Sequence, residues 1–448
     1  MIAVRNSFLI LLLAAGCAVD DEEITSAEAF EGKHKPKFGL GYNVHLSSQA
    51  RFEPIQPGAD PERGRVLFGV AEDMNTQDPS GALFQGMSSV AGHEIVSNGR
   101  SCFSCHRGEE VYFGMPKPPL SSSIPPDDPL FTGVHADSQQ DPDGPFNLEN
   151  FGLIKYRPNR FNQARPADDP YRQVFFWRKS PSLFNVGLSH GFLLDGRARA
   201  MLETDRGAIF SHTQEGDARF DDLFNSQQLN DLAAFQFTLF TDPVLAALRD
   251  PSDPMYDVLT SDPFATVEVT TKAQQRGKKV FIKNCMVCHD APNVFNHSGN
   301  LATLGTDGVD PEYPVFAPHV GRSFNIGVSE RNKHGLRFTR PVGPGQFEPI
   351  VIPLANEDGT INMHTVTFDI GMAATTGRTV DIGRFKVPQL RNIRLYGPYF
   401  HDNSADTLEE VVDYFNSDDY NQSADGRRFP IKMNAKQRAD LVEFLKIL

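Results

Sequence analysis

Two short stretches, Cys102-Phe103-Ser104-Cys105-His106 and Cys285-Met286-Val287-Cys288-His289, dominate the interpretation of this sequence. Each places two thiols three positions apart, with a histidine directly after the second thiol. This spacing is typical of a c-type haem attachment site, in which both sulfurs bond the porphyrin and the imidazole binds the iron. The sequence therefore predicts two covalently bound haem c groups, each with a histidine as iron ligand.

Other interpretations of the four thiols explain less. Paired Cys-x-x-Cys hooks also bind zinc, so the four thiolates could form one all-cysteine zinc site, but zinc does not explain a histidine after both pairs. A thioredoxin-like redox pair would need a strand-helix pattern, which surrounds neither stretch. Cys17 is the only other cysteine, so no disulfide framework is available.

The composition favours an ordered protein with more than one core. A chain of 448 residues with 40% hydrophobic content can bury two cores, one around each haem motif. Its 32 prolines and 36 glycines favour long ordered loops over a helical bundle. A formal net charge of -14 disfavours nucleic acid and anionic membrane surfaces as partners, and favours basic electron donors or neutral substrates.

The beginning of the chain has the features of a secretory signal. Residues 1–16 contain one basic residue, then an apolar run too short to span a bilayer, then small residues. The stretch Leu13-Ala14-Ala15-Gly16-Cys17 resembles a bacterial lipobox, with a plain signal peptide and an incidental Cys17 as the alternative. We expect a periplasm-facing protein, lipid-anchored through Cys17 to a bacterial membrane, by preference the outer one. Residues 17–58 then form a linker.

A repeated frame places a helix ahead of each haem motif. Asp60 and Pro61 predict a helix start before residues 63–68 (RGRVLF), and the capping box of residues 271–274 predicts one before residues 276–281 (RGKKVF). The shared Arg-Gly-basic-x-apolar-Phe pattern is an internal repeat. Further helices are expected after Ser226, ending near Pro243, after the capping box at Thr407, and after Asn434.

The two repeats suggest two domains. We expect an N-terminal haem domain over residues 59–250 and a C-terminal haem domain over residues 251–448, with the boundary in a stretch rich in Pro, Ser and Asp. Residues 107–170 read as a long loop that covers or shapes access to the first haem, with a surface excursion as the alternative.

Three further stretches resemble the bacterial di-haem cytochrome c peroxidase family, which includes MauG-type enzymes. They are residues 180–186 (SPSLFNV) leading to 195–198 (DGRA), residues 383–392 (GRFKVPQLRN) leading to 397–402 (GPYFHD), and residues 407–413 (TLEEVVD). The resemblance implies a mainly α fold of two cytochrome-c-like haem domains with long irregular loops. It also implies that the haem held by Cys102, Cys105 and His106 reacts with peroxide, while the haem held by Cys285, Cys288 and His289 relays electrons.

The resemblance also suggests catalytic residues, because O–O cleavage needs an acid/base near the iron. In the family, a Gln and a Glu after the Asp-Gly-Arg turn have this role. The equivalent positions here are Thr204 and Gln214, so neither residue is kept. Glu215 could serve after a one-residue shift, and residues 207–214 resemble a branch of the family with His-x-Gln, which favours His212 and Gln214. We therefore predict His212, Gln214, Glu215 and Arg197, the last from the Asp-Gly-Arg turn, as catalytic residues.

Other positions depart from the family. Leu194 replaces a tryptophan that lies between the haems, and Lys179 replaces a calcium-binding asparagine, so calcium is not predicted. In the family, a Met or Tyr is the axial ligand of the second haem. The equivalent position here is Phe415, which cannot bind iron. Tyr414 is adjacent, and a thioether could substitute from Met363 or, as we predict, from Met372.

The main functional hypothesis is a peroxidase that reduces hydrogen peroxide to water, with a small cytochrome or cupredoxin as electron donor. MauG-like oxidation of a protein or organic substrate through high-valent haem iron is one alternative. A non-catalytic di-haem electron-transfer cytochrome is another.

Overall fold

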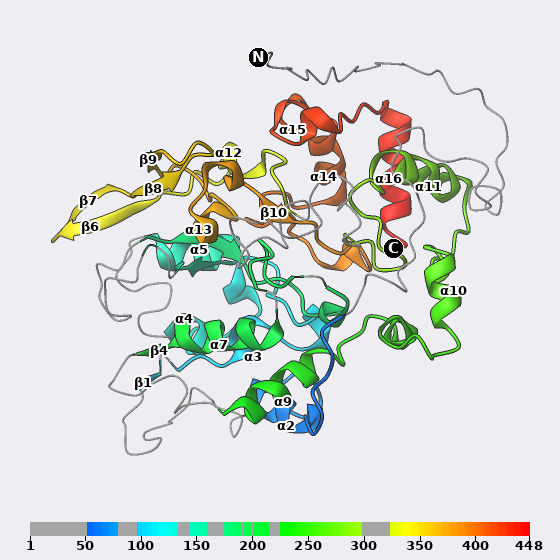
Figure 1. Cartoon of the computed structure of the whole chain (residues 1–448), viewed down its shortest axis with the longest axis horizontal. Helices are drawn as coiled ribbons and strands as arrows, with labels where there is room; N and C mark the ends of the chain where they lie inside the picture. Colours follow the sequence, from blue (N-terminus) through cyan, green and yellow to red (C-terminus); the bar gives the residue numbers. More distant parts are fainter. Residues whose placement is uncertain are drawn as a thin grey trace, which may run out of the picture. The chain divides into compact units, whose positions relative to one another are not determined.

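The computed structural model describes residues 52–78, 96–97, 99–132, 143–158, 161, 174–189, 191–198, 200–214, 225–297 and 323–448. All of them belong to one compact unit. Helices predominate among the regular elements of these ranges (Figure 1), as expected, and none of these helices has the length and apolarity needed to span a membrane. The predicted signal peptide, Cys17 and most of the predicted linker lie outside the described residues. Below, the N-terminal half runs to residue 250 and the C-terminal half begins at residue 251.

The elements of the N-terminal half surround the first haem motif. They are α2 (Pro61–Phe68), β1 (Val96–Ser97), α3 (Cys102–Cys105), α4 (Pro129–Thr132), α5 (Gly144–Phe151), β2 (Leu153–Tyr156), β3 (Phe176–Lys179), η3 (Val186–Leu188), α7 (Met201–His212), β4 (Thr213–Gln214), α9 (Ser226–Gln236) and η4 (Pro243–Arg249). Strands β1 and β4 pair antiparallel, as do β2 and β3.

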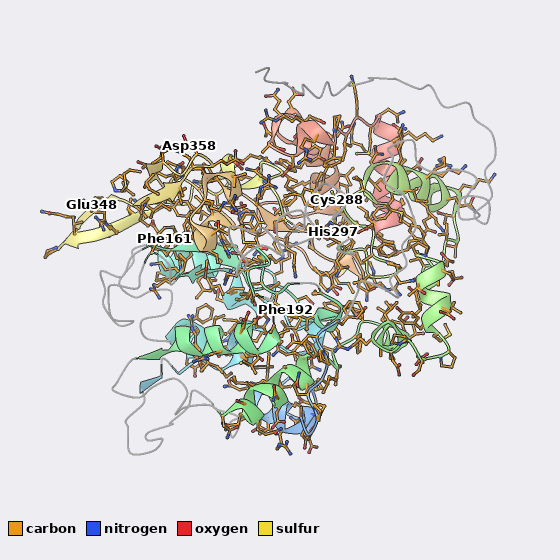
Figure 2. All side chains as sticks on the ribbon, viewed as in Figure 1. Phe161, Phe192, Cys288, His297, Glu348 and Asp358 are labelled. Carbon is orange, nitrogen blue, oxygen red and sulfur yellow. The ribbon has the colours of Figure 1, made fainter. Side chains whose placement is uncertain are left out.

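The C-terminal half adds two hairpins to a second set of helices. Its elements are α10 (Tyr256–Ser261), α11 (Lys272–Asn284), β5 (Ser323–Phe324), α12 (Val328–Arg331), β6 (Thr339–Gly343), β7 (Gln346–Pro349), β8 (Val351–Ala355), β9 (Ile361–Thr365), α13 (Ala373–Thr376), β10 (Phe385–Lys386), η8 (Ile393–Leu395), α14 (Leu408–Phe415), α15 (Asp418–Gln422) and α16 (Ala435–Leu445). Strand β10 pairs with β5, β6 with β7, and β8 with β9, all antiparallel. Glu348 lies near the end of the β6–β7 hairpin (Figure 2).

The predicted helix starts are confirmed in most cases. Asp60 caps α2 by accepting from the N–H groups of Glu62 and Arg63, and Thr271 and Asn434 each form a capping box at α11 and α16. Each side-chain oxygen satisfies a backbone donor that the first helical turn leaves unpaired.

Two helices differ from the prediction in their caps, and one of them also in its end. The cap of α9 is Asn225 rather than Ser226, and α9 ends at Gln236, so Leu239 lies beyond it. At α14, Thr407 accepts from the Glu410 N–H, but the Glu410 side chain accepts from the Asp406 N–H. The expected reciprocal box is therefore a one-sided cap.

Each half is built on a close pair of crossed helices. In the N-terminal half, α2 crosses α9 where Gly64 meets the Asp231 carbonyl, and a Cβ at Gly64 would lie 1.9 Å from that oxygen. In the C-terminal half, α11 crosses α16 where Gly277 meets the Asp440 carbonyl, and a Cβ at Gly277 would lie 2.0 Å from that oxygen. The arginine before each glycine pairs with the same aspartate (Arg63 with Asp231, Arg276 with Asp440). The predicted internal repeat is thus the helix crossing of each half.

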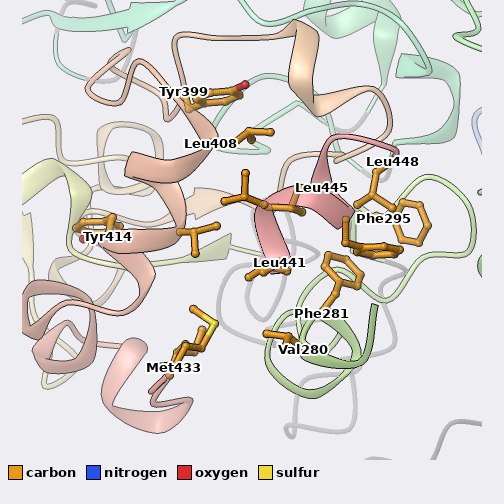
Figure 3. Close-up of a cluster of buried hydrophobic side chains, with 14 of the residues drawn as sticks. Val280, Phe281, Phe295, Tyr399, Leu408, Tyr414, Met433, Leu441, Leu445 and Leu448 are labelled. Atoms are coloured by element: carbon orange, nitrogen blue, oxygen red, sulfur yellow. The ribbon is translucent and has the colours of Figure 1, made fainter. Parts of the chain in front are cut away.

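The cores around these helix pairs also correspond. Phe68 packs on Phe235 with ring centroids 5.3 Å apart, and Phe281 packs on Phe444 at 5.4 Å. Figure 3 shows the core of the C-terminal half, in which Val280 and Phe281 of α11 lie in one cluster with Leu441 and Leu445 of α16. Cys102 of the first motif packs against one of these clusters and Cys285 of the second against the other. A third cluster joins Phe176 and Trp177 of β3 to Ile352 and Leu354 of β8, so the predicted division into one core per motif stays a prediction.

A second repeat relates the segment that begins at Asn185 to the segment that begins at Asn392, with a constant offset of 207 positions (392 minus 185). Asn185 and Asn392 both adopt left-handed backbone, with φ of 57° and 56°, directly before a 3-10 turn. The β-bridge between Phe192 and Ala198 recurs between Tyr399 and Ala405, and α7 and α14 begin at Met201 and Leu408. Residues on α7 can therefore be compared directly with residues on α14.

The predicted long loop over residues 107–170 contains regular structure. Its described part holds α4, α5 and β2, which pairs with β3. Residues 154–158 and Phe161 line the cavity described below, and the expected role of this segment in access to the first haem stays a prediction. Likewise, the last residues of the predicted 17–58 linker pack on the N-terminal half, where Glu53 accepts from the Met201 N–H at 2.6 Å.

Candidate functional site

The two attachment motifs have the same local geometry. Helix α3 carries Cys102 and Cys105, and His106 follows as its C-cap; Cys285 follows α11, with Cys288 and His289 in the next turn. The Nδ1 atom of His106 lies 3.0 Å from the Phe113 carbonyl oxygen, and that of His289 lies 2.7 Å from the Phe295 carbonyl oxygen. A carbonyl accepts only from Nδ1–H, so the lone pair that can bind a metal lies on Nε2 in each neutral ring. At His106, the Ser180 hydroxyl lies 3.3 Å from that Nε2 atom.

Burial favours the neutral form of these groups. It lowers the pKa of His106, and it lowers the pKa of His289 to about 4. Neutral imidazole is the form that binds iron. Burial also raises the pKa of Cys285 to about 12. No group of three or more His, Cys, Asp or Glu side chains in the described ranges could hold a metal ion, which leaves the single four-cysteine zinc site without support.

One continuous cavity reaches both motifs. It has a volume of about 1330 Å³ and is lined by Cys102, Cys105 and His106 and by Cys285, Cys288 and His289. A pocket for one small molecule is usually about 300–1,000 Å³, so this cavity is large enough for more than one such group. Neutral buried histidines held at Nδ1, unbridged thiols and a mainly apolar lining fit one covalently bound haem c in each half.

The α7 and α14 walls of the cavity differ in side-chain size. Gly207 and Ala208 line it from α7, and a Cβ added at Gly207 would meet no atom within 4 Å. The equivalent positions on α14 are Tyr414 and Phe415, and Phe415 lines the cavity. Small residues therefore leave room in the N-terminal half where an aromatic ring fills the C-terminal half.

Sequence reasoning missed a buried polar pair on the α7 wall. Asp205 is 8% exposed, lines the cavity and accepts at Oδ1 from Nε2 of Gln236, at 2.7 Å. Burial raises the pKa of Asp205 to about 8, and Glu53 adds to this rise, against the Gln236 hydrogen bond, which lowers it. Aligning α7 with α14 would have marked Asp205, because its counterpart is Val412.

Arg197, predicted to be catalytic, lines the cavity and belongs to a buried ion network. Its Nη1 donates to Asp195 Oδ1 at 2.8 Å, and its guanidinium lies 3.8 Å from the Tyr156 ring centroid. Arg178 donates to the other oxygen of Asp195 at 2.7 Å. Burial opposes ionisation of Asp195, but Arg197 and Arg178 outweigh it and lower the pKa to about 2.

The other predicted catalytic residues are described only in part. His212 ends α7, and Gln214 pairs with Val96 in the β1–β4 ladder, but their side chains lie outside the described structure. Glu215 lies entirely outside it. Thr204, at the family's Gln position, lines the cavity and donates its hydroxyl to the Ala200 carbonyl at 3.2 Å.

The candidates for the second axial ligand are spread over the C-terminal half. Tyr414 donates its hydroxyl to the Ile326 carbonyl at 2.6 Å, and Met363 is 66% exposed on β9. Met372 is buried, with its N–H on the Arg384 carbonyl, and it is not among the described residues that line the cavity. Its assignment as an iron ligand stays a prediction. Met433, which the sequence reasoning did not single out, is buried and does line the cavity.

Two equivalent lysines cross between the halves. Lys179 donates from Nζ to the carbonyl oxygens of Pro398 at 2.5 Å and Tyr396 at 3.2 Å. Lys386 donates to the Gly191 carbonyl at 3.1 Å in the opposite direction. Burial lowers the pKa of each to about 8. The Lys179 ammonium thus already binds two carbonyl oxygens at the position where the family has its calcium ligand.

Leu194, at the family's tryptophan position, lines the cavity. Its counterpart in the second repeat is His401, which also lines the cavity and stacks on Phe385 with ring centroids 3.9 Å apart. A different aromatic contact joins the halves, between Tyr112 and Tyr396 at 5.5 Å.

Comparison with known proteins gives several relatives. No family model matches the chain. It is 23% identical over 307 residues to the cytochrome-c peroxidase IdrP2 of Denitromonas iodatirespirans, covering 64% of this chain and 72% of the relative. It is 40% identical over 65 residues to the methylamine utilization protein MauG of Methylorubrum extorquens, covering 14% and 18%. The solved diheme peroxidase BthA from Burkholderia thailandensis covers 90% of this chain and 88% of its own, with 15% identity and a TM-score of 0.41.

The names of these relatives agree with the family that the attachment motifs and the stretches around residues 180, 383 and 407 resemble. They identify the chain as a relative of the bacterial di-haem cytochrome c peroxidase and MauG family.

Proposed function

We propose that the chain is a di-haem peroxidase that reduces hydrogen peroxide to water in its N-terminal half, with electrons delivered through its C-terminal half. Cys102, Cys105 and His106 would hold one haem c, and Cys285, Cys288 and His289 the other. When bound, haem iron supplies the redox chemistry that accepts and delivers electrons. The named relatives are peroxidases and MauG, which supports this class of reaction.

The difference between α7 and α14 carries the assignment of roles to the halves. Gly207 and Ala208 leave space along the N-terminal part of the cavity, whereas Phe415 occupies the equivalent place in the C-terminal part. A reactive haem needs an open side for peroxide, while a relay haem works best when it excludes external ligands.

The chain's own residues would orient both haems. The Phe113 and Phe295 carbonyls hold His106 and His289 in one tautomer and one ring orientation. Hydrogen bonds between the halves, including one of 2.9 Å from Asn185 to Gln389, would hold the two haems in a constant relation. We further propose periplasmic exposure, a lipid anchor at Cys17, domains over residues 59–250 and 251–448, and a small basic electron-transfer protein as donor.

Filling the N-terminal space tests this proposal. Ala208→Phe copies the aromatic residue that α14 carries at the equivalent position, so we expect the holoprotein to keep both haems. Cyanide binding should be lost, and peroxide-dependent oxidation of a reduced donor should fall at least about 100-fold. The internal control is the absorption spectrum of the C-terminal haem on reduction, which should not change.

Three outcomes would count against the proposal. Equal turnover in the wild type and in Ala208→Phe would mean that the N-terminal half is not where peroxide reacts. Oxidation of a bound organic substrate without donor oxidation would favour the MauG-like alternative. A wild-type protein that binds no external ligand in any redox state would be an electron-transfer cytochrome.

A further inference from the structure

We infer that Asp205, held in place by Gln236, exchanges protons with the oxygen reactant bound in the N-terminal half of the cavity. This inference rests on the proposed function and names the acid/base group that it requires. Peroxide must lose a proton from one oxygen and gain one on the other as the O–O bond breaks, so a proton-holding group is needed there.

The geometry gives Asp205 one fixed oxygen and one free oxygen. Oδ1 accepts from Gln236, whose Nε2 also lies 3.3 Å from the Leu232 carbonyl of its own helix. Oδ2 is buried and has no hydrogen-bond partner among the residues that the structure describes. Asp205 and Gln236 are 8% and 3% exposed, and both line the cavity. The carboxyl is therefore oriented by one oxygen while the other can bind a proton or a ligand.

The C-terminal half shows that the fold does not need this pair. The 207-position offset places Val412 of α14 at the position of Asp205. The match of Asp231 with Asp440 and Phe235 with Phe444 places Leu445 of α16 at the position of Gln236. Val412 and Leu445 are both buried in the hydrophobic core there. The same two helix positions are thus apolar in the half assigned to electron relay and polar in the half assigned to chemistry.

A polar pair at these positions carries a free-energy cost. A buried polar atom without a partner destabilises the fold relative to a satisfied one. A valine and a leucine pack the equivalent space without that cost. A chemical use for the free oxygen explains why the N-terminal half has Asp205 and Gln236 where the C-terminal half has an apolar pair.

The proposed proton transfers balance over the whole reaction. One hydrogen peroxide takes up two electrons, supplied by the reduced donor protein, and two protons, supplied by solvent, to give two waters. Within that reaction, the Asp205 carboxylate takes the proton that leaves one peroxide oxygen. It then returns this proton to the other oxygen as the O–O bond breaks.

The charged groups around Asp205 define its expected pH dependence. Glu53, from the segment before α2, raises its pKa. Cys102 lies close on the α3 side, but its sulfur carries no charge once it is bonded to haem. On its own helix, Glu203 and Arg206 are exposed, and Gln236 of α9 is neutral. Because the carboxylate form must act first, the rate constant for reaction with peroxide should rise with pH up to about 8 and level off above it.

The test compares holoprotein variants by stopped-flow reaction with hydrogen peroxide over a range of pH, and by infrared difference spectroscopy across the same titration. Asp205→Asn should lower the rate constant by about 10²–10⁴ and remove its rise with pH. It should also remove the infrared carbonyl band of a protonated carboxyl that disappears near pH 8 in the wild type. Asp257→Asn, an exposed aspartate on α10, is the matched control and should change neither readout.

A double variant covers the case in which Asp205→Asn folds badly. Asp205→Val with Gln236→Leu copies the pair that the C-terminal half already packs, so haem content should be retained while the peroxide reaction slows to the same extent. If both variants react within threefold of wild type and keep the infrared band, Asp205 is not the proton-exchanging group. That result would leave the peroxidase proposal standing. A wild type without donor oxidation would instead remove the proposed function, while the infrared band would still report on Asp205.

Discussion

His106 and His289 show how single residues prepare the site before any haem is attached. Each ring lies against a backbone carbonyl six or seven residues further along the chain. That contact fixes the tautomer, and burial keeps the ring neutral. Asp205 is the contrasting case, because burial disfavours its charged form more than the hydrogen bond from Gln236 favours it, and its pKa is raised.

The first prediction concerns the stability cost of Asp205. Its pKa in the folded protein is about 8, against an ordinary value of 3.8. Between these pH values the unfolded chain has lost the proton and the folded chain retains it, so the free energy of unfolding falls as pH rises from about 4 to about 8. Asp205→Asn should remove this fall and be more stable than wild type at pH 8.

Urea unfolding of the two holoproteins at pH 5 and pH 8 measures this effect. The difference between variant and wild type isolates Asp205 from the other titrating groups. Asp257→Asn should follow wild type at both pH values. A variant that is destabilised equally at both would mean that Asp205 acts by packing alone.

At the scale of elements, close helix crossings organise both halves. The α2–α9 and α11–α16 pairs approach so closely that Gly64 and Gly277 contact the backbone of the opposing helix. A glycine in a helix interior normally costs about 0.5–1 kcal/mol relative to alanine, so here close packing outweighs helix propensity.

The second prediction follows from these contacts. Gly64→Ala and Gly277→Ala should each lower the free energy of unfolding by about 1–3 kcal/mol, because the added methyl would overlap a backbone carbonyl of the partner helix. Gly207→Ala on α7 is the matched control, since its Cβ would meet no atom within 4 Å. It should raise the free energy of unfolding by up to about 1 kcal/mol. Denaturant unfolding compares all three, and equal effects would refute the close crossings.

At the scale of the whole molecule, buried polar contacts join the two halves. Arg178 of β3 donates from Nη1 to Asp195 at 2.7 Å and from Nε to Asp369 at 2.6 Å, and all three side chains are almost fully buried. One guanidinium therefore links the Asp-Gly-Arg turn of the N-terminal half to the loop before α13.

The third prediction is that Arg178→Met lowers the free energy of unfolding by about 3–5 kcal/mol, because it leaves buried Asp369 without its arginine and leaves buried Asp195 with Arg197 alone. Arg340→Met removes an exposed arginine from its pair with Glu348 and should change stability by at most about 1 kcal/mol. Denaturant unfolding at pH 7 measures both. The loss in Arg178→Met should shrink at low pH, where protonation of Asp195 relieves the charge that Arg178 no longer neutralises. A loss no larger than that of Arg340→Met would mean that this link contributes nothing to stability.

The sequence by itself determined the features that depend on neighbours along the chain. Caps at Asp60, Thr271 and Asn434 join a side chain to a backbone group two or three residues away, so local pattern predicts them. The attachment motifs are equally local, and the repeated Arg-Gly frame predicted a helix before each. The capping box predicted at Thr407 was only half right, because the Glu410 side chain accepts from the Asp406 N–H instead of the Thr407 N–H.

Only the tertiary structure decided the features that join distant parts of the chain. Asp205 and Gln236 lie 31 positions apart, and Arg178 and Asp369 lie 191 apart. No spacing rule predicts such pairs, because the free energy of a buried polar group depends on which residues surround it after folding. Two haem attachment sites could thus be predicted from ten residues, whereas the difference in side-chain size between the two halves became visible only when α7 and α14 could be compared as walls of one cavity.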